Sequence, residues 1–191
     1  LIIGFVWPEP NSSAAGGRMM QLISIFKENG FEITFASPAL DSDFMVNLSE
    51  FEVEKKSIEL NNSSFDDFII ELNPDVVLFD RFMIEEQFGW RLAENCPKAI
   101  RLLDTEDLHC LRIARQKAFK ENRVFELTDL LSEEVAKREI ASILRCDLSF
   151  IISQFEMKIL NEVFKIDSGL LHYLPFLVDE MSEDDLLELP P

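Results

Sequence analysis

The 191 residues fit one large domain, and a hydrophobic content of 47% excludes intrinsic disorder of the chain as a whole. The 36 Asp and Glu residues outnumber the 18 Lys and Arg residues, giving a net charge of −18. This charge argues against general nucleic-acid binding and against anionic membrane surfaces, because both polyanions are held largely by Lys and Arg. No apolar run approaches the roughly 18 residues of a membrane-spanning helix, so no transmembrane segment is expected.

The chain begins with the pattern of a strand–helix–strand unit. Residues 1–7 are apolar without interruption and predict a buried strand. The prolines and glycines of residues 8–17 predict a loop, and residues 18–29 place most of their apolar side chains on one helical face. Alternation over residues 31–37 predicts a second strand, so this region is expected to form a parallel βαβ unit.

Strands and helices continue to alternate along the rest of the chain. Short apolar strands separated by helices are typical of an α/β fold, and we expect a three-layer, Rossmann-like parallel sheet with helices on both faces. The further strands are predicted at residues 51–58, 75–80, 98–104, 147–152 and 170–174, and the further helices at residues 63–72, 83–95, 107–120, 132–145 and 153–164.

Gly16, Gly17 and Arg18 stand between the first predicted strand and the first predicted helix. Ligands of parallel α/β sheets bind at the carboxyl ends of the strands, where this segment is expected. Glycines let a ligand approach the backbone, a helix start attracts anions, and Arg18 would add a positive charge. The dinucleotide and P-loop glycine fingerprints are both absent. The alternative is that the two glycines only form a tight turn.

A second polar group follows the strand that ends at Asp104. Asp104, Glu106 and Asp107 could bind a hydroxyl or act as a general base, with His109 close behind. Alternatively, Asp104 or Thr105 caps the next helix, and Glu106 and Asp107 complement its dipole. The residues alone leave both interpretations open.

Three further polar signals have local interpretations. Asp80 and Arg81 follow a strand directly and form either a ligand clamp or a salt-bridged loop. Ser153 and Glu156 have the spacing of a capping box, which predicts the start of a helix. Ser132, followed by two glutamates, has the pattern of an N-cap with an acidic first turn.

The cysteines and histidines predict neither a disulfide framework nor a metal site. Cys96, Cys110 and Cys146 are odd in number and widely spaced, and the only histidines are His109 and His172. Reduced thiols are typical of a cytoplasmic protein, so a cytoplasmic location is expected. No metal-ligand spacing is present.

Taken together, four segments resemble the N-terminal half of GT-B-fold retaining glycosyltransferases, of the glycosyltransferase-4-like type that uses nucleotide sugars. They are similar to that family's glycine-rich loop with its second strand, its strand-end T-x-H-D segment, its A-D-x-V-I-x-x-S-x-x-E segment and its I-P-N-G-V-D hinge. In this chain they occupy residues 7–38, 104–109, 147–156 and 174–179. Glu106 stands where the family often has histidine, which puts a histidine role there in doubt.

The resemblance implies an acceptor-side, Rossmann-like domain over residues 1–179, and an acidic linker or tail over residues 180–191 leading to a donor-binding domain. Substrate contacts, on the acceptor or the diphosphate, would come from Gly16, Gly17, Arg18, Asp104, Glu106 and Asp107, with no catalytic residue assigned.

The resemblance also implies a small-molecule or glycan acceptor and no permanently bound cofactor. The nucleotide-sugar donor would bind only when the second domain is present, so we expect the chain alone to be inactive. An exposed inter-domain face could support a homodimer. The alternative is a stand-alone, non-catalytic domain that binds a sugar, a nucleotide or a protein.

Overall fold

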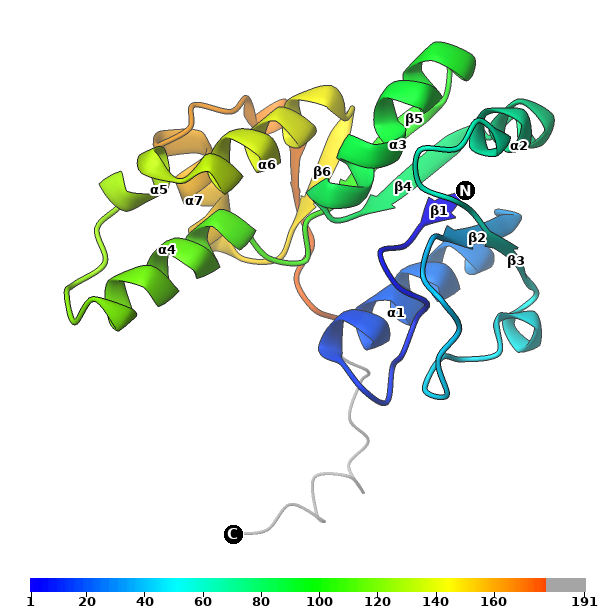
Figure 1. The fold of residues 1–191 in the computed structure, drawn as a ribbon, viewed down its shortest axis with the longest axis horizontal. Coiled ribbons are helices and arrows are strands. Elements are labelled where there is room, and N and C mark those ends of the chain that lie inside the picture. Colours follow the sequence, from blue (N-terminus) through cyan, green and yellow to red (C-terminus); the bar gives the residue numbers. More distant parts are fainter. Residues whose placement is uncertain (178–191) are drawn as a thin grey trace, which may run out of the picture.

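The fold is that of a computed structural model, which describes residues 1–177. Seven parallel strands form one sheet in the order β3-β2-β1-β4-β5-β6-β7 (Figure 1). This confirms the predicted α/β, Rossmann-like class. The strands are β1 (Ile2–Ile3), β2 (Ile33–Ser37), β3 (Val53–Ser57), β4 (Val76–Asp80), β5 (Ile100–Asp104), β6 (Leu148–Ile151) and β7 (Leu171–Tyr173).

Helices cover both faces of the sheet, because successive strand residues point to opposite sides. Ile2 packs in the apolar cluster that holds α1, whereas Ile3 packs in the cluster that holds α2, α3, α6 and α7. Helices α4 and α5 pack against α6. The helices are α1 (Ala14–Glu28), α2 (Ser64–Leu72), α3 (Phe82–Asn95), α4 (His109–Lys120), α5 (Thr128–Ser132), α6 (Glu134–Arg145) and α7 (Gln154–Glu162), with short 3₁₀ turns η1 (Leu48–Phe51) and η2 (Ser168–Leu170).

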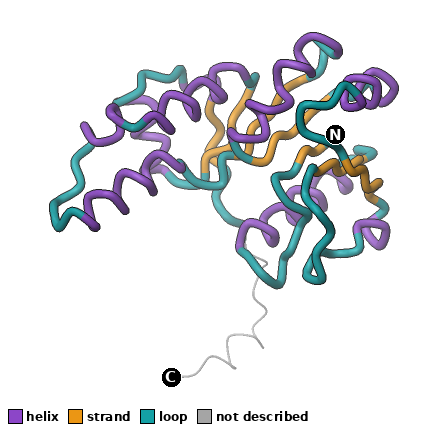
Figure 2. The backbone as a smooth tube through the Cα atoms, in the orientation of Figure 1, coloured by secondary structure: helices purple, strands orange, loops and turns teal. Residues whose placement is uncertain are grey.

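The first strand is shorter than the predicted span of residues 1–7. The Gly4 N–H still donates to the Ala36 carbonyl at 2.8 Å, but the Phe5 N–H leaves the ladder and donates to the Asp80 carboxylate at 3.0 Å, so the strand ends at Ile3. The chain then runs as a long loop, in which Trp7 is buried and donates its indole N–H to the Ala39 carbonyl at 3.0 Å. The loops after β1 and β2 therefore lie side by side (Figure 2).

The first helix starts earlier than predicted, at Ala14, so Gly16 and Gly17 belong to its first turn and form no loop or tight turn. Ser13 is the N-cap, and its hydroxyl accepts the Gly16 N–H at 3.0 Å. The predicted start at residue 18 was based only on the apolar face of the helix. The Ser13 cap lets the helix begin at Ala14, before the first residue of that apolar face.

The predicted cap at Ser132 is wrong. Ser132 is the last residue of α5, a helix that was not predicted, and its hydroxyl donates to the Asp129 carbonyl at 2.8 Å. Glu133 takes the N-cap position of α6 without a side-chain cap bond. At α7 the prediction is confirmed, because the Ser153 hydroxyl accepts the Glu156 N–H at 3.2 Å.

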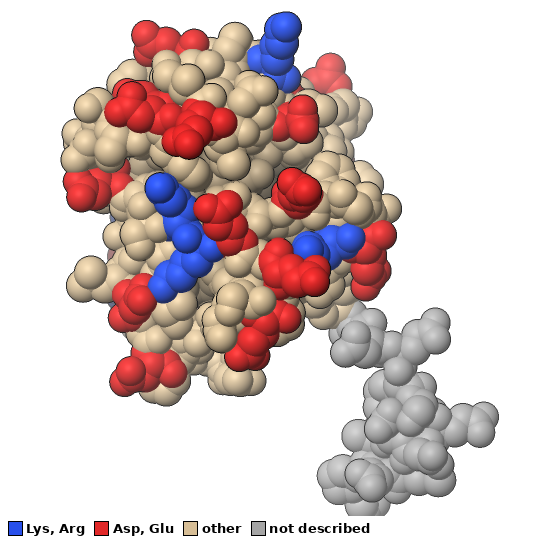
Figure 3. All heavy atoms as spheres, turned by 90° about the vertical axis from the view of Figure 1, so that its right-hand side faces the viewer, with Lys and Arg blue, Asp and Glu red and all other residues tan. Residues whose placement is uncertain are grey.

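Acidic side chains are spread widely over the face in Figure 3, with few basic ones among them, as the net charge of −18 leads one to expect. The domain boundary expected at residue 179 and the segment 180–191 lie outside the described residues.

Candidate functional site

The strand order reverses between β1 and β4, the usual ligand position in such sheets. From β1 the chain moves outward through β2 and β3, then returns to β4 and continues toward β7. At the carboxyl edge here, the Phe5–Asp80 hydrogen bond links the loop after β1 to the end of β4. Five charged residues surround this point and are called the carboxyl-edge cluster: Arg18, Asp80, Arg81, Asp104 and Glu106.

The deepest part of the cluster is an ion pair between Arg18 on α1 and Asp104 at the end of β5. Arg18 Nε lies 2.9 Å from Asp104 Oδ2, and Arg18 Nη2 lies 2.9 Å from Asp104 Oδ1. Their side chains are 2% and 0% exposed, and Arg18 Nη1 also donates to the Pro175 carbonyl at 3.0 Å. The pair therefore connects α1 to β5, and Arg18 also connects α1 to the segment after β7. The two charged groups bind each other.

The two glycines of α1 have different surroundings. A Cβ atom on Gly16 would lie 2.4 Å from the backbone carbon and oxygen of Glu9, so the loop after β1 requires this glycine. A Cβ on Gly17 would have no heavy atom within 4 Å. Gly17 is thus the glycine whose surroundings leave room for a ligand beside the start of α1.

Asp80 is the buried carboxyl group of the cluster. Oδ2 accepts the Phe5 N–H, while Oδ1 is enclosed and has no hydrogen bond within residues 1–177. Burial, and after it the negative charge of Glu106, raise the pKa of Asp80 to about 7, although the positive charge of Arg81 opposes the shift. Burial also raises the pKa of Glu106, with Arg81 acting in the opposite direction. Asp80 therefore favours its protonated form up to near neutral pH, and Glu106 holds a proton more readily than a free glutamate does.

This shift predicts that Asp80 makes the folded state less stable as the pH rises. Between pH 3.8 and about 7 the folded protein holds the Asp80 proton that the unfolded chain has released. The free energy of unfolding then falls with pH, by up to about 1.4 kcal/mol per pH unit for one proton. Asp80→Asn should gain stability relative to the parent between about pH 5 and pH 8, measured by urea unfolding. A difference that stays constant with pH would contradict the buried proton.

Arg81 and Glu106 form the outer pair of the cluster. Arg81 Nε donates to Glu106 Oε2 at 2.7 Å, and the side chains are 19% and 11% exposed. Arg81 also lies 3.4 Å from Asp80 Oδ1 and covers the ring of Phe5 at 5.4 Å. Both residues have positive φ, 73° for Arg81 and 58° for Glu106. Such backbone strain in non-glycine residues occurs often at functional sites.

Asp107 forms its contacts with other partners than this outer pair. Asp107 Oδ2 accepts from Arg112 Nε at 2.7 Å, and Asp107 Oδ1 lies 3.3 Å from His109 Nδ1. Of the predicted site residues, the structure brings Arg18, Asp104 and Glu106 together at one edge of the sheet, where Asp80 and Arg81 also lie. Asp107 instead contacts Arg112 and His109.

The start of α4 is capped by carboxylates from distant helices, so the predicted caps Asp104 and Thr105 are wrong. Thr105 Oγ1 donates to the Phe150 carbonyl at 2.9 Å. Glu139 of α6 accepts the N–H groups of His109 and Cys110, each at 2.9 Å, and Glu156 of α7 accepts the Leu108 N–H at 2.9 Å.

Glu139 was missed by the sequence analysis, although a signal existed. It occupies the inward face of α6 between Ala136 and Ile143, where a lone glutamate needs a partner. Burial raises the pKa of Glu139 to about 7 despite these N–H donors.

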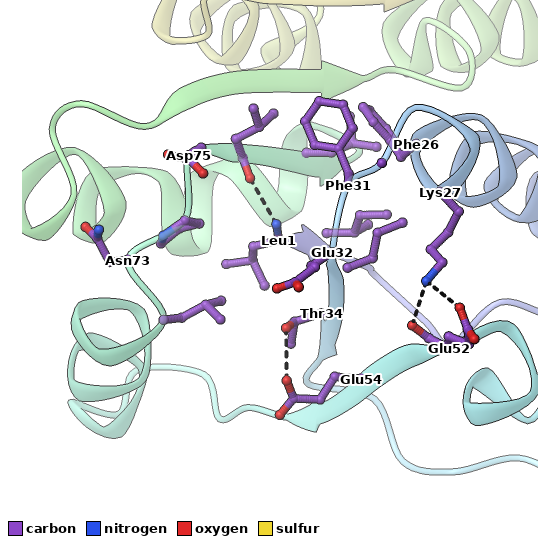
Figure 4. A pocket seen from close by; sticks show the side chains of 17 residues that line it. Leu1, Phe26, Lys27, Phe31, Glu32, Thr34, Glu52, Glu54, Asn73 and Asp75 are labelled. Atoms are coloured by element: carbon purple, nitrogen blue, oxygen red, sulfur yellow. Dashed lines mark hydrogen bonds and ion pairs between the residues drawn. The ribbon is translucent and has the colours of Figure 1, made fainter.

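Two cavities lie away from the cluster. One, of about 780 Å³, lies at the amino ends of the strands and is lined by residues such as Lys27, Glu54 and Asp75 (Figure 4). In it, Thr34 Oγ1 donates to Glu54 Oε2 at 3.2 Å. The other, of about 560 Å³, lies beside η1.

Residues 1–177 contain no group of three or more His, Cys, Asp or Glu side chains placed to hold a metal ion. None of the helices described is both long and apolar enough to cross a membrane.

Comparisons with known proteins show the fold. No protein-family model matches the chain, and no curated protein matches it in sequence. Among solved structures, it is similar to one described as a UDP-N-acetylglucosamine 2-epimerase from Listeria monocytogenes, with a TM-score of 0.51 and 12% sequence identity. The match covers 89% of this chain and 43% of that one, so this chain corresponds to less than half of its structural neighbour.

Proposed function

We propose that this chain is the acceptor-side domain of an enzyme that acts on nucleotide sugars, a glycosyltransferase of GT-B architecture. The observation that carries the proposal is the fold, which is similar to 43% of an enzyme whose name includes a UDP-sugar. The sequence segments that resemble GT-B glycosyltransferases support the same assignment. The carboxyl-edge cluster supports it further, because it stands where the strand order reverses.

The acceptor, a small molecule or a glycan, would bind outside the Arg81–Glu106 pair. Carboxylates accept hydrogen bonds from sugar hydroxyls, and Glu106 and Asp107 remain partly exposed. Gly17 leaves open space beside the start of α1, where a diphosphate would meet the helix dipole. The buried Arg18–Asp104 pair would position α1 and β5 without touching the ligand.

The nucleotide-sugar donor would be held by a second domain across the carboxyl edge. Phe5, Val6 and Phe176 are each at least 40% exposed, and such apolar side chains mark a surface that meets another protein unit. A second copy of this chain is the other occupant of this face that we consider. No permanently bound cofactor forms part of the proposal, and its setting is the cytoplasm.

A non-catalytic binding domain is the second candidate. It is favoured by one observation: the charges of the cluster already neutralise one another, with Arg18 paired to Asp104 and Arg81 paired to Glu106. Such pairs fix a structure as readily as they serve a reaction.

The two candidates differ in activity. The 191-residue chain should bind UDP-N-acetylglucosamine only weakly, with a Kd of about 1 mM or more, and show no turnover, because the proposal assigns donor binding to a second domain. NMR titration should move amide signals near Arg81 and Gly17, and Arg81→Gln should remove these shifts while Lys158→Gln on α7 leaves them. The complete gene product should release UDP. Binding without UDP release by the complete gene product would favour the non-catalytic domain, and turnover by the 191-residue chain would place the whole catalytic site within it.

A further inference from the structure

Strand β3 forms one edge of the sheet. In the part of the chain that the structure describes, it pairs only with β2, and it lies on the right-hand side of Figure 1. Its first residue, Val53, is buried, whereas residues 54–57 are all exposed. An edge strand presents unpaired backbone N–H and C=O groups, to which a further strand can add.

The hydrogen bonding to β2 shows which backbone groups of β3 point outward. Directly after the strand, the Ile58 N–H donates to the Ser37 carbonyl of β2 at 3.1 Å. Successive strand residues direct their backbone groups to alternate sides, so the even-numbered residues here point toward β2. The N–H and C=O groups of the odd-numbered residues, of which Lys55 is the central one, therefore point away from the sheet.

Glu54 and Lys56 carry opposite charges on the same face of β3. Glu54 accepts a hydrogen bond from the Thr34 hydroxyl at 3.2 Å, and Lys56 Nζ lies 5.1 Å from the centre of the Phe68 ring. Neither contact supplies an opposite charge. Figure 3 views this side of the molecule, where basic side chains lie among acidic ones.

Lys55 lies on the other face and is paired within its own chain. Its Nζ atom is 2.6 Å from Asp41 Oδ1 and 4.6 Å from the centre of the Trp7 ring. Charged side chains on an edge strand usually prevent pairing with other strands. Since Lys55 is already neutralised, Glu54 and Lys56 decide which strand can add here.

We propose that β3 pairs with β3 of a second copy of this chain, in an antiparallel arrangement centred on Lys55. Glu54 of each copy then stands opposite Lys56 of the other copy, at the non-hydrogen-bonded positions where side chains approach most closely. An axis centred on residue 54 or on residue 56 would place two like charges opposite each other. The charges of β3 therefore select one register.

Apolar side chains beyond the two ends of β3 fit the same register. Phe51 precedes the strand and is 42% exposed, and Leu60 follows it and is 50% exposed. In the antiparallel pair, Phe51 of each copy lies toward Leu60 of the other copy, so both bury apolar surface. The two carboxyl edges face opposite ends of this dimer and stay open to a ligand or a further domain.

Sedimentation velocity of the 191-residue chain measures the association, at a salt concentration of about 0.15 M that screens the repulsion between two chains of net charge −18. We expect a reversible dimer with a Kd of about 10–100 µM, because a five-residue strand pair forms a small interface. A chain that stays monomeric up to about 1 mM would overturn the proposal.

A proline substitution tests the backbone pairing. Lys55→Pro should abolish the dimer, because proline removes the outward N–H group and is tolerated on edge strands. Lys55→Ala removes the same side chain and should retain the dimer. Equal dimerisation of the two folded variants would overturn the strand pairing, and circular dichroism checks that each folds. If Lys55→Pro does not fold, the charge exchange below decides alone.

Charge exchange tests the register. Lys56→Glu and Glu54→Lys should each weaken the dimer at least about tenfold, because like charges then face each other at two positions. An equimolar mixture of these two variants should dimerise, because opposite charges face each other only in the mixed dimer. Lys158→Glu changes the net charge as Lys56→Glu does, but on α7, and should match the parent. Full dimerisation of each single variant, or a mixture that stays monomeric, would overturn the proposal.

Discussion

Asp104→Ala is expected to lower the free energy of unfolding by about 3–5 kcal/mol, because it leaves the Arg18 guanidinium buried without its carboxylate. Arg18→Met should cost a similar amount, since Asp104 is then buried unpaired and the Pro175 carbonyl loses its donor. Urea unfolding of each variant measures these losses.

The double variant Arg18→Met/Asp104→Leu distinguishes a mutual pairing from a simple loss of volume. It should recover most of the stability, because replacing both buried charges with apolar side chains is often neutral. Lys137→Met, which removes an exposed pair with Glu134, is the control and should cost less than about 1 kcal/mol. Additive losses in the double variant would show that Arg18 and Asp104 act independently.

Gly16→Ala and Gly17→Ala should change stability in opposite directions, although the two residues are neighbours in the first turn of α1. The new Cβ at position 16 would lie 2.4 Å from the Glu9 backbone, which must move, at a cost of about 1–3 kcal/mol. At position 17 the Cβ enters open space, and alanine should stabilise the helix by up to about 1 kcal/mol. Thermal and urea unfolding of the pair provide the measurement, and equal effects would contradict the close approach of Glu9.

Gly17 also allows a functional measurement that Gly16 does not. Gly17→Val should change stability little, yet in the complete gene product it should abolish UDP release by filling the space beside the start of α1. Full activity in a folded Gly17→Val variant would show that no ligand approaches α1 there.

The sequence by itself determined the class of fold and, for every strand except β1, approximately where the strand ends. Apolar strands, such as residues 76–79, alternate with amphipathic helices. This periodicity is a local property of the sequence, so it can be recognised without knowing which elements pack together. The capping spacing of Ser153 and Glu156 is local in the same sense, and the α7 start was predicted correctly. The shortening of β1 was not predictable in this way, because it depends on Asp80, 75 residues away.

Only the tertiary structure decided what the charged residues do. Arg18 and Asp104 are 86 positions apart, and the start of α4 is capped by Glu139 and Glu156 from 30 and 48 positions away. A sequence pattern indicates that a polar residue lies on a buried face, but it does not identify the partner that satisfies it. The partner is set by which elements the chain brings together, since a buried charge must be paired wherever the fold places it.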